Sequence, residues 1–409
     1  MKKFDKKSAG FDATRLERIT DHINRMYIEP KKITGCQILV SRNGVDTYSR
    51  TFGLMDRERN KALREDTIFR IYSMSKPITS VALMMLYERG LFQLTDPVHR
   101  FIPSWKDQQV YVSGEGETLS SLQTRAPLSP ITMAHILSHQ SGLTYGATRH
   151  PVDQVYRKLK LTFNPDANET LSSFVEKLSQ VPLRFDPGES WMYSFSTDVC
   201  GYLVEAISGK PFNQYLEEEI FRPLGMKDTS FDIKPEKIER FAANYERLPD
   251  KSLKLIDDPK DSTYFGDQKF FSGGGGLLST SHDYALFCKM LLGGGALDGH
   301  RLLGSRTLKL MTMNHLREGK TLMDLAVGAF SETAYDGVGF GLGFASTLSQ
   351  TERGVLGCGD FYWGGAASTI FWVDPIENMY VIFMTQLMPS TTFNFRGQLK
   401  NIIYSAITD

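Results

Sequence analysis

Ser73 and Lys76 have the S-x-x-K spacing that suits covalent catalysis by a serine. They belong to Ser73-Met74-Ser75-Lys76, which stands just before an apolar, helix-like run that ends near Gly90. If a helix begins at Ser73, Lys76 lies on the same face, so its amine can reach the serine hydroxyl and act as the base that a serine nucleophile needs. The first-turn N–H groups of such a helix could bind an oxyanion. Taken alone the pattern is weak, because a helix-capping Ser73 and a solvated Lys76 would look the same.

Two other patterns suggest different chemistry but lack residues that it requires. His135 and His139 are four residues apart, yet Ile136-Leu137-Ser138 between them lacks the glutamate of H-E-x-x-H, so we expect no metal site there. We also expect the chain to use no cofactor. The run Gly273 to Gly276 is not followed by Gly-Lys-Ser or Gly-Lys-Thr, which favours close chain packing over a phosphate loop. The sequence also lacks G-x-S-x-G, which argues against an α/β-hydrolase triad.

Hairpins at both ends of the chain could supply the framework that positions these residues. The strand-like runs Cys36 to Ser41 and Asp46 to Thr51 are separated by Asn43-Gly44, two residues that tolerate positive φ. Near the other end, Ala367 to Val373 and Met379 to Thr385 are apolar, β-branched and aromatic runs joined by a short polar turn. The sequence therefore predicts two antiparallel hairpins far apart in the chain.

Helical patterns surround and separate these hairpins. Leu16 to Tyr27 and Leu399 to Ile407 have the apolar spacing of helices, and the middle of the chain, 73–264, is mostly helical with Pro- and Gly-containing loops. We predict one catalytic domain over residues 1–409, of α/β (α+β) class: an antiparallel sheet from both chain ends (1–72 and 265–409), flanked by helices, with a mostly helical insertion. A site would lie in the cleft between the two parts.

Composition argues against several classes of partner. With 47 Lys plus Arg and 47 Asp plus Glu, the chain has no overall basic field for nucleic acid or an anionic membrane, so we expect a small-molecule partner. Met1 to Thr20 lacks an apolar run of signal-peptide type, which predicts a cytoplasmic protein. The four scattered cysteines, without C-x-x-C, are expected to be reduced, buried thiols.

Several motifs together resemble the serine beta-lactamase-like hydrolases. The segment Thr67 to Pro77 is similar to their active-site segment, and further motifs follow in the same order along nearly the whole chain. These motifs are Ile136-Leu137-Ser138-His139-Gln140-Ser141-Gly142-Leu143, Pro187-Gly188 with Trp191-Met192-Tyr193-Ser194, Pro223-Leu224-Gly225-Met226, and Gly274-Gly275-Gly276-Leu277-Leu278-Ser279-Thr280. Within the superfamily the chain looks closest to the esterases related to class C beta-lactamases, called family VIII carboxylesterases.

The resemblance implies a role for each motif. It makes Ser73 the nucleophile and Lys76 and Tyr193 its proton-transfer partners. It places the third motif at Trp363-Gly364-Gly365-Ala366, just before the strand that begins at Ala367, with the backbone amides of Ser73 and Ala366 as the oxyanion hole. The alternatives are a tyrosine packed in the core with a satisfied hydroxyl, and a glycine bulge beside a buried aromatic.

Two departures from the family pattern affect the substrate. The class C pattern Tyr-x-Asn is Tyr193-Ser194-Phe195 in this sequence, and tryptophan, as in the esterase branch, replaces the lysine of Lys-Thr-Gly. With Phe195, Tyr362, Trp363, Gly364 and Gly365 as substrate-binding residues, the site suits an apolar acyl or alcohol group. The function implied is hydrolysis of short-chain carboxylic esters, with weak beta-lactamase activity still allowed. The alternatives are a beta-lactamase, a D-amino-acid peptidase or an acyltransferase on the same scaffold, and a non-catalytic binding module.

Overall fold

The computed structural model describes residues 9–163, 165–166, 168–328 and 332–409. The lysines at positions 2, 3, 6 and 7, which belong to the N-terminal segment used to predict location, lie outside these residues. Within the described ranges, no helix is both long enough and apolar enough to cross a membrane. The four cysteines are free, and Cys358 is only partly buried, unlike Cys36, Cys200 and Cys288.

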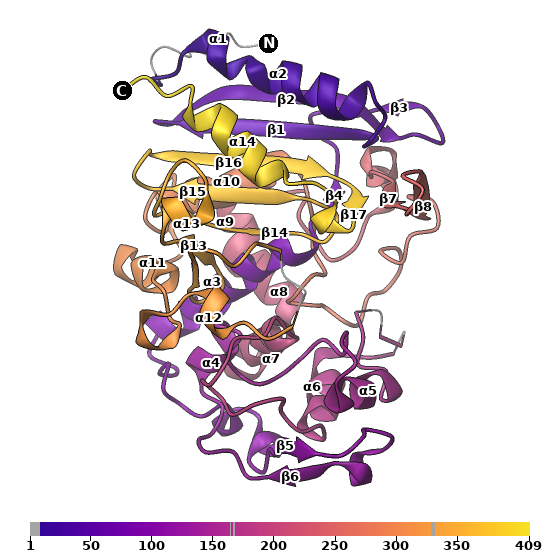
Figure 1. Cartoon of the computed structure of the whole chain (residues 1–409), viewed down its shortest axis with the longest axis vertical. Coiled ribbons are helices and arrows are strands. Elements are labelled where there is room, and N and C mark those ends of the chain that lie inside the picture. The colour runs from indigo at the N-terminus through magenta and orange to yellow at the C-terminus, as the bar shows by residue number, and fades with distance from the viewer. Residues whose placement is uncertain (1–8, 164, 167, 329–331) are drawn as a thin grey trace.

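An eight-stranded antiparallel sheet forms the upper half of the molecule in Figure 1. Its strands come from both ends of the chain. In spatial order they are β12 (Val338–Phe340), β13 (Ala345–Thr347), β14 (Phe361–Gly364), β15 (Ile370–Asp374), β16 (Met379–Thr385), β1 (Gly35–Arg42), β2 (Val45–Asp56) and β3 (Lys61–Ala62). The central pair, β1 with β16, joins the two predicted hairpins, with Ile38 opposite Phe383. The prediction of one antiparallel sheet built from both chain ends is therefore confirmed.

The first hairpin forms where the sequence predicted it. β1 and β2 are connected through Asn43 and Gly44, whose φ angles are 54° and 75°. Positive φ at both central residues gives a turn whose twist matches that of the flanking strands. The second hairpin, β15 with β16, begins at Ile370 and not at Ala367, because residues 365–369 form the turn that follows β14.

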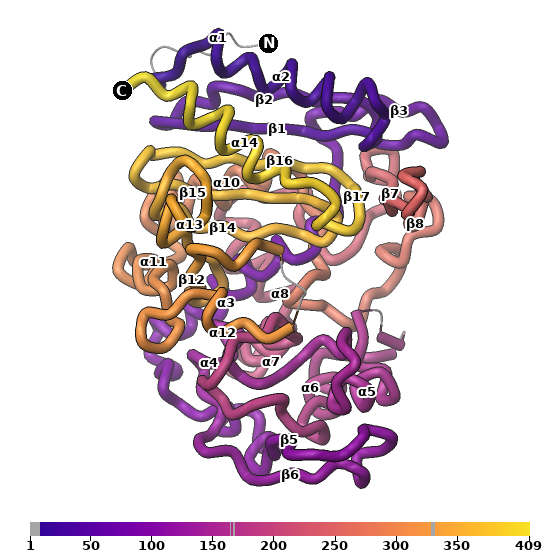
Figure 2. The backbone as a smooth tube through the Cα atoms, in the orientation of Figure 1, coloured from indigo at the N-terminus to yellow at the C-terminus, as the bar shows by residue number. Residues whose placement is uncertain are grey.

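Helices cover both faces of the sheet. The ring of Phe395 in α14 (Phe395–Tyr404) packs on Phe383, whereas Tyr284 in α10 (Ser281–Leu292) packs on Phe371. Phe371 lies opposite Ile382, the neighbour of Phe383, so α14 and α10 lie on opposite faces. Helices α1 (Ala13–Leu16) and α2 (Arg18–Ile23) lie beside α14, as the tube in Figure 2 shows.

The middle of the chain supplies the mostly helical part below the sheet (Figure 1). Its helices are α3 (Ser75–Glu88), α4 (Met133–Leu137), α5 (Pro151–Lys158), α6 (Leu171–Ser179), α7 (Ser196–Ser208), α8 (Phe212–Leu216) and α9 (Arg222–Leu224). It also holds the β5 (Val110–Ser113) and β6 (Gln123–Arg125) ribbon. Residues Ser75 to Leu86 of α3 are all buried, as in a helix that is packed on every side. The site can therefore be built on a helix held by both parts.

The remaining elements connect the two parts of the molecule. A parallel pairing of β17 (Leu387–Met388) with β7 (Asn244–Arg247), extended by β8 (Leu253–Asp257), ties the end of the helical region to the C-terminal strands. A short bridge of β4 (Phe69–Arg70) with β9 (Leu278–Ser279) lies just before Ser73 in the chain. Further short elements are β10 (Ala296–Leu297), β11 (His300–Arg301), α11 (Ser305–Thr312), α12 (Leu322–Leu325) and α13 (Gln350–Arg353).

Candidate active site

Ser73 lies at the junction between the sheet and the central helix. It belongs to a 3₁₀ turn, Tyr72–Met74, that leads directly into α3, so the regular helix starts two residues later than the motif suggested. The preceding Tyr72 has a φ of 42°, which is uncommon for a residue with a side chain. Ser73 as a whole residue is 8% exposed. The nucleophile candidate is thus held on a constrained turn and remains reachable.

Lys76 approaches the serine as the S-x-x-K spacing predicts. Its Nζ donates to Ser73 Oγ at 3.1 Å and to the carbonyl of Gly274. The ammonium also lies 4.6 Å from the centre of the Tyr193 ring. Burial lowers the pKa of Lys76 to about 8, although the carboxylates of Asp198 and Glu332 act in the opposite direction. An amine with this pKa is partly neutral near pH 8 and can accept a proton.

Tyr193 completes a compact hydrogen-bonded group. Its hydroxyl is hydrogen-bonded to Ser73 and Tyr145, and Trp363 Nε1 donates to it at 3.0 Å. Burial raises the pKa of Tyr193 well above its ordinary value, the Glu332 carboxylate adds to this effect, and the three hydrogen bonds oppose it. The phenol is therefore protonated at neutral pH, so its hydroxyl can donate a proton.

Strand register decides which predicted residues face this group. Trp363 pairs with Phe371 on the α10 face of the sheet, so its indole points toward the helical part and Tyr193. Tyr362, the next residue along the strand, points to the other face and stacks under Arg396 of α14. The structure thus does not bring Tyr362 to Ser73, although the sequence grouped it with the substrate-binding residues.

The turn after β14 lies against the strand that leads to Ser73. A Cβ atom on Gly365 would be only 2.3 Å from the carbonyl oxygen of Ile71, so glycine permits this close approach. Among the described residues the Ala366 N–H has no acceptor. Trp363 and Gly364 end β14 itself, so the third motif follows one strand and does not directly precede the next. A backbone donor is left available beside the Ser73 turn.

Phe195 lies one ring away from the reactive group. It is buried at the start of α7, where its ring contacts Tyr145 at 4.8 Å and Phe174 at 5.0 Å between centres. It therefore packs behind Tyr145, whose ring in turn contacts that of Tyr193 at 5.2 Å between centres. A cavity of about 20 Å³ lies beside Tyr193 and Tyr145, room for roughly one water molecule.

Three residues of the site have no motif that would have singled them out in the sequence. Tyr145 follows Gly142-Leu143-Thr144 in a loop, Asp198 is the third residue of α7, and Glu332 lies just before β12 in the chain. The ring nitrogens of His139, which was not expected to bind a metal, lie 3.3 Å from the hydroxyls of Ser194 and Thr197.

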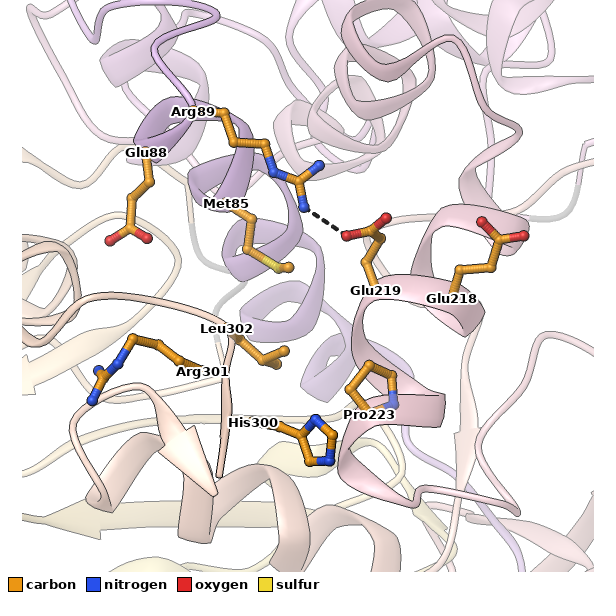
Figure 3. Close-up of a pocket in the computed structure, with 9 residues that line it drawn as sticks. All are labelled: Met85, Glu88, Arg89, Glu218, Glu219, Pro223, His300, Arg301 and Leu302. Atoms are coloured by element: carbon orange, nitrogen blue, oxygen red, sulfur yellow. Dashed lines mark hydrogen bonds and ion pairs between the residues drawn. The ribbon is translucent and has the colours of Figure 1, made fainter. Parts of the chain in front are cut away.

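A separate pocket lies at the far end of α3. It has a volume of about 470 Å³ and is lined by charged side chains, among them Arg89 and Glu219, which form an ion pair (Figure 3). None of the predicted site residues contributes to its lining. The chemistry therefore belongs to the Ser73 group and not to this larger hollow.

Comparison with known proteins agrees with this geometry. The family model described as "Beta-lactamase" matches residues 21–402. This chain belongs to the beta-lactamase family. An uncharacterized protein of Mycobacterium tuberculosis (strain CDC 1551 / Oshkosh) is 31% identical over 342 residues, 82% of each chain. Esterase EstB of Burkholderia gladioli is 27% identical over 402 residues, 93% of each chain.

A solved structure shows the same fold over nearly the whole chain. EstCE1, described as a hydrolase with promiscuous acyltransferase activity, superposes with a TM-score of 0.78 at 24% identity, covering 97% of this chain and 99% of its own. The predicted beta-lactamase-like architecture is therefore confirmed.

Proposed function

We propose that this beta-lactamase-family chain is a serine esterase that hydrolyses short-chain carboxylic esters through an acyl-Ser73 intermediate. The observation that carries the proposal is the contact of Ser73 Oγ with both Lys76 Nζ, at 3.1 Å, and the Tyr193 hydroxyl. A serine becomes a nucleophile when a positioned base takes its proton. The similarity to Esterase EstB supports ester hydrolysis as the reaction.

The two proton-transfer partners would have different tasks. Because burial lowers the pKa of Lys76 to about 8, its neutral amine is available as the base. The raised pKa of Tyr193 keeps its hydroxyl protonated, so this hydroxyl can pass a proton on to the leaving group. Ser73 Oγ attacks the ester carbon while its proton passes to Lys76. Tyr193 gives its proton to the departing alkoxide, and the proton on Lys76 then restores Tyr193. Water cleaves the acyl-enzyme by the same route and releases the acid.

Backbone amides would bind the negative oxygen of the tetrahedral intermediate. We assign this role to the N–H groups of Ser73 and Ala366, because the Gly365 turn lies against Ile71, two residues before the serine. Two fixed donors stabilise the charge as it develops on the oxygen. Losing one such donor costs roughly 2.7 to 4 kcal/mol of transition-state stabilisation.

The substrate group beside the ester would be small and uncharged. Trp363 offers its N–H to Tyr193, so this position supplies neither the cation nor the hydroxyl of Lys-Thr-Gly for a substrate carboxylate. We retain Trp363, Gly364 and Gly365 as the substrate-binding wall and assign Phe195 an indirect part through Tyr145. Membership of the family VIII branch is part of this proposal, and the cytoplasmic location stays a prediction.

Acyl transfer to an alcohol is the second candidate. It uses the same acyl-Ser73 intermediate, and the acyltransferase activity described for EstCE1 favours testing it. Beta-lactam and D-amino-acid peptide cleavage need a partner for the substrate carboxylate. One enzyme preparation should be given p-nitrophenyl butyrate, the same ester with added methanol, and a chromogenic cephalosporin. We expect the highest kcat/KM for ester hydrolysis; a cephalosporin value at or above it would refute the ester assignment.

The nucleophile is tested by labelling. A fluorophosphonate should add its phosphonyl group to Ser73 in the wild-type chain, as located by mass spectrometry, and Ser73→Ala should lose both labelling and turnover while its circular dichroism is unchanged. Ser75→Ala is the matched control, because the Ser75 hydroxyl accepts the Leu277 N–H and is not assigned to the reaction. Labelling of another serine, with Ser73→Ala still active, would overturn the proposal.

A further inference from the structure

Asp198 is a buried carboxylate that the reaction scheme does not use. It lies in the first turn of α7 and is 2% exposed. Its Oδ1 atom accepts hydrogen bonds from Ser272 Oγ at 2.5 Å and from the Gly274 N–H at 3.1 Å. Both donors belong to the glycine-containing loop that precedes β9. A buried carboxylate is costly unless its hydrogen bonds and a nearby positive charge compensate it, so the origin of that charge matters.

The positive charge is Lys76, which contacts the other side of the same peptide segment. Gly274 donates its N–H to Asp198 and accepts the Lys76 ammonium at its carbonyl oxygen. No side chain fits at this position, because a Cβ atom on Gly274 would be 2.6 Å from Asp198 Oδ2. Thr79, one turn after Lys76 on α3, donates to the neighbouring carbonyl of Gly273 at 2.8 Å. The loop is therefore fixed between α3 and α7.

We infer that Asp198 is a positioning residue for the reaction: through Gly274 it fixes the Lys76 amine beside Ser73, and through its charge it favours the ammonium form. The inference rests on the proposed function of Lys76 as the base. It differs from a purely structural role, because a structural acid would affect stability without changing the pH at which Ser73 becomes reactive.

Several titratable groups face the Lys76 amine. They are Asp198 from α7, Glu332, the rings of Tyr145 and Tyr193, and the imidazole of His139. Asp198 is the main charge opposing the effect of burial on the pKa of Lys76, ahead of Glu332. Burial lowers the pKa of His139 and raises those of both tyrosines, so these three groups are neutral near pH 7. The two carboxylates, Asp198 and Glu332, are therefore the groups whose removal should change the pKa of Lys76.

Asp198→Asn tests the inference because it keeps the size and an acceptor but removes the charge. Without the carboxylate the pKa of Lys76 should fall, since the ammonium loses its stabilising partner. The acidic limb of kcat/KM for p-nitrophenyl butyrate should then move to lower pH by roughly one pH unit. The rate of Ser73 labelling by a fluorophosphonate, measured over the same pH range, should move in parallel. Glu205→Gln is the matched control on the same helix, since Glu205 accepts the Phe212 N–H and should leave the limb in place.

Two outcomes would overturn the inference. One is a folded Asp198→Asn variant in which the acidic limb of kcat/KM stays at the wild-type pH or moves to higher pH. If that variant does not fold, Lys76→Met/Asp198→Asn should restore folding, as circular dichroism measures, because neither charge is then left alone in the core. A double variant that also fails to fold is the second contradicting outcome. If no ester is turned over but Ser73 is still labelled, the proposed substrate fails while this test remains decisive.

Discussion

The hydroxyl of Tyr193 receives the indole N–H of Trp363 at the position where lactamases of this type carry lysine. Replacing lysine by tryptophan changes which group this side chain can bind. A lysine ammonium can reach a substrate carboxylate, whereas the fixed indole donor is directed at the tyrosine oxygen. Because the indole N–H donates to the hydroxyl oxygen, Trp363 holds the hydroxyl in place and does not compete for its hydrogen. One substitution at this position accounts both for the proposed loss of carboxylate recognition and for the ordered proton donor.

Trp363→Phe should lower kcat/KM for a short-chain ester about 3- to 10-fold, the effect of one lost neutral hydrogen bond. Kinetics with p-nitrophenyl butyrate measure it. The control is Trp372→Phe, which removes the same atoms from the adjacent strand β15, where the tryptophan is also buried. If both variants lose the same activity, the effect comes from core packing and not from the hydrogen bond to Tyr193.

The pH dependence of kcat/KM should reflect Lys76. Its folded pKa of about 8 means that the neutral amine increases as pH rises through 8, so activity should rise with an acidic limb near that value. The pKa of Tyr193 is raised above its ordinary value, so its hydroxyl keeps its proton over this range. We therefore expect no decrease in kcat/KM between pH 8 and pH 10. An uncharged ester measured from pH 6 to 10 provides the profile. A limb near pH 6, or none, would exclude Lys76 as the base.

Sequence spacing predicted which side chains meet only where the two residues are separated by a short, regular stretch of backbone. Ser73 and Lys76 are three residues apart at the start of a helix, and the structure places Nζ 3.1 Å from Oγ. Tyr145 and Asp198 come to the site from a loop and from another helix, so no local pattern marks them. Tyr362 was misplaced because the facing of a strand residue depends on register, which becomes known only when both partners of β14 are known.

At the level of elements, the site depends on two turns that approach the Ser73 segment closely. One is the glycine-containing loop before β9, which contacts α3, and the other is the β14–β15 turn, which contacts Ile71. The run Gly273 to Gly276 predicted close packing, which is confirmed at Gly274. Gly365 makes a similarly close approach, to Ile71, that the sequence did not predict. The partner surfaces were not predictable, because they belong to segments 76 residues or more away in the chain.

Gly365→Ala should separate the β14–β15 turn from Ser73. The added methyl group would lie 2.3 Å from both the Ile71 carbonyl and Thr369 Oγ1, so the turn must shift. We expect roughly a 100-fold loss in kcat, since a displacement near 1 Å misplaces the Ala366 donor. Gly275→Ala is the comparison, because its methyl group would make only ordinary contact, 3.8 Å from Tyr72. Equal losses in the two variants would contradict the role given to the turn.

At the level of the whole molecule, strands from the two ends of the chain pair with each other in one sheet. β1 and β16 are separated by more than 330 residues, yet they form the centre of the sheet, with Cys36 opposite Thr385 and Arg42 opposite Met379. From the apolar patterns, the sequence predicted both hairpins and a single antiparallel sheet built from the two ends of the chain. Strand order and register came from tertiary packing, which hydrophobic periodicity does not encode. The β17–β7 pairing, which links residues 387–388 to the helical region, had no sequence signal.

The predicted organisation, one catalytic domain with an α/β part and a helical part, leads to a test of cooperativity. We propose that the two parts unfold together, because one continuous cluster of buried side chains includes Phe174 in α6 and Phe383 in β16, and because α3 packs against α7 along its buried length. Separate domains would each have their own core and could melt independently. Hydrogen exchange during guanidinium unfolding measures this for each segment. Peptides covering α6 and β16 should lose protection at the same denaturant concentration, with the same dependence on it. A midpoint for α6 clearly below that for β16 would show that the helical part is an independent unit, and the cleft would then lie between two domains and not within one.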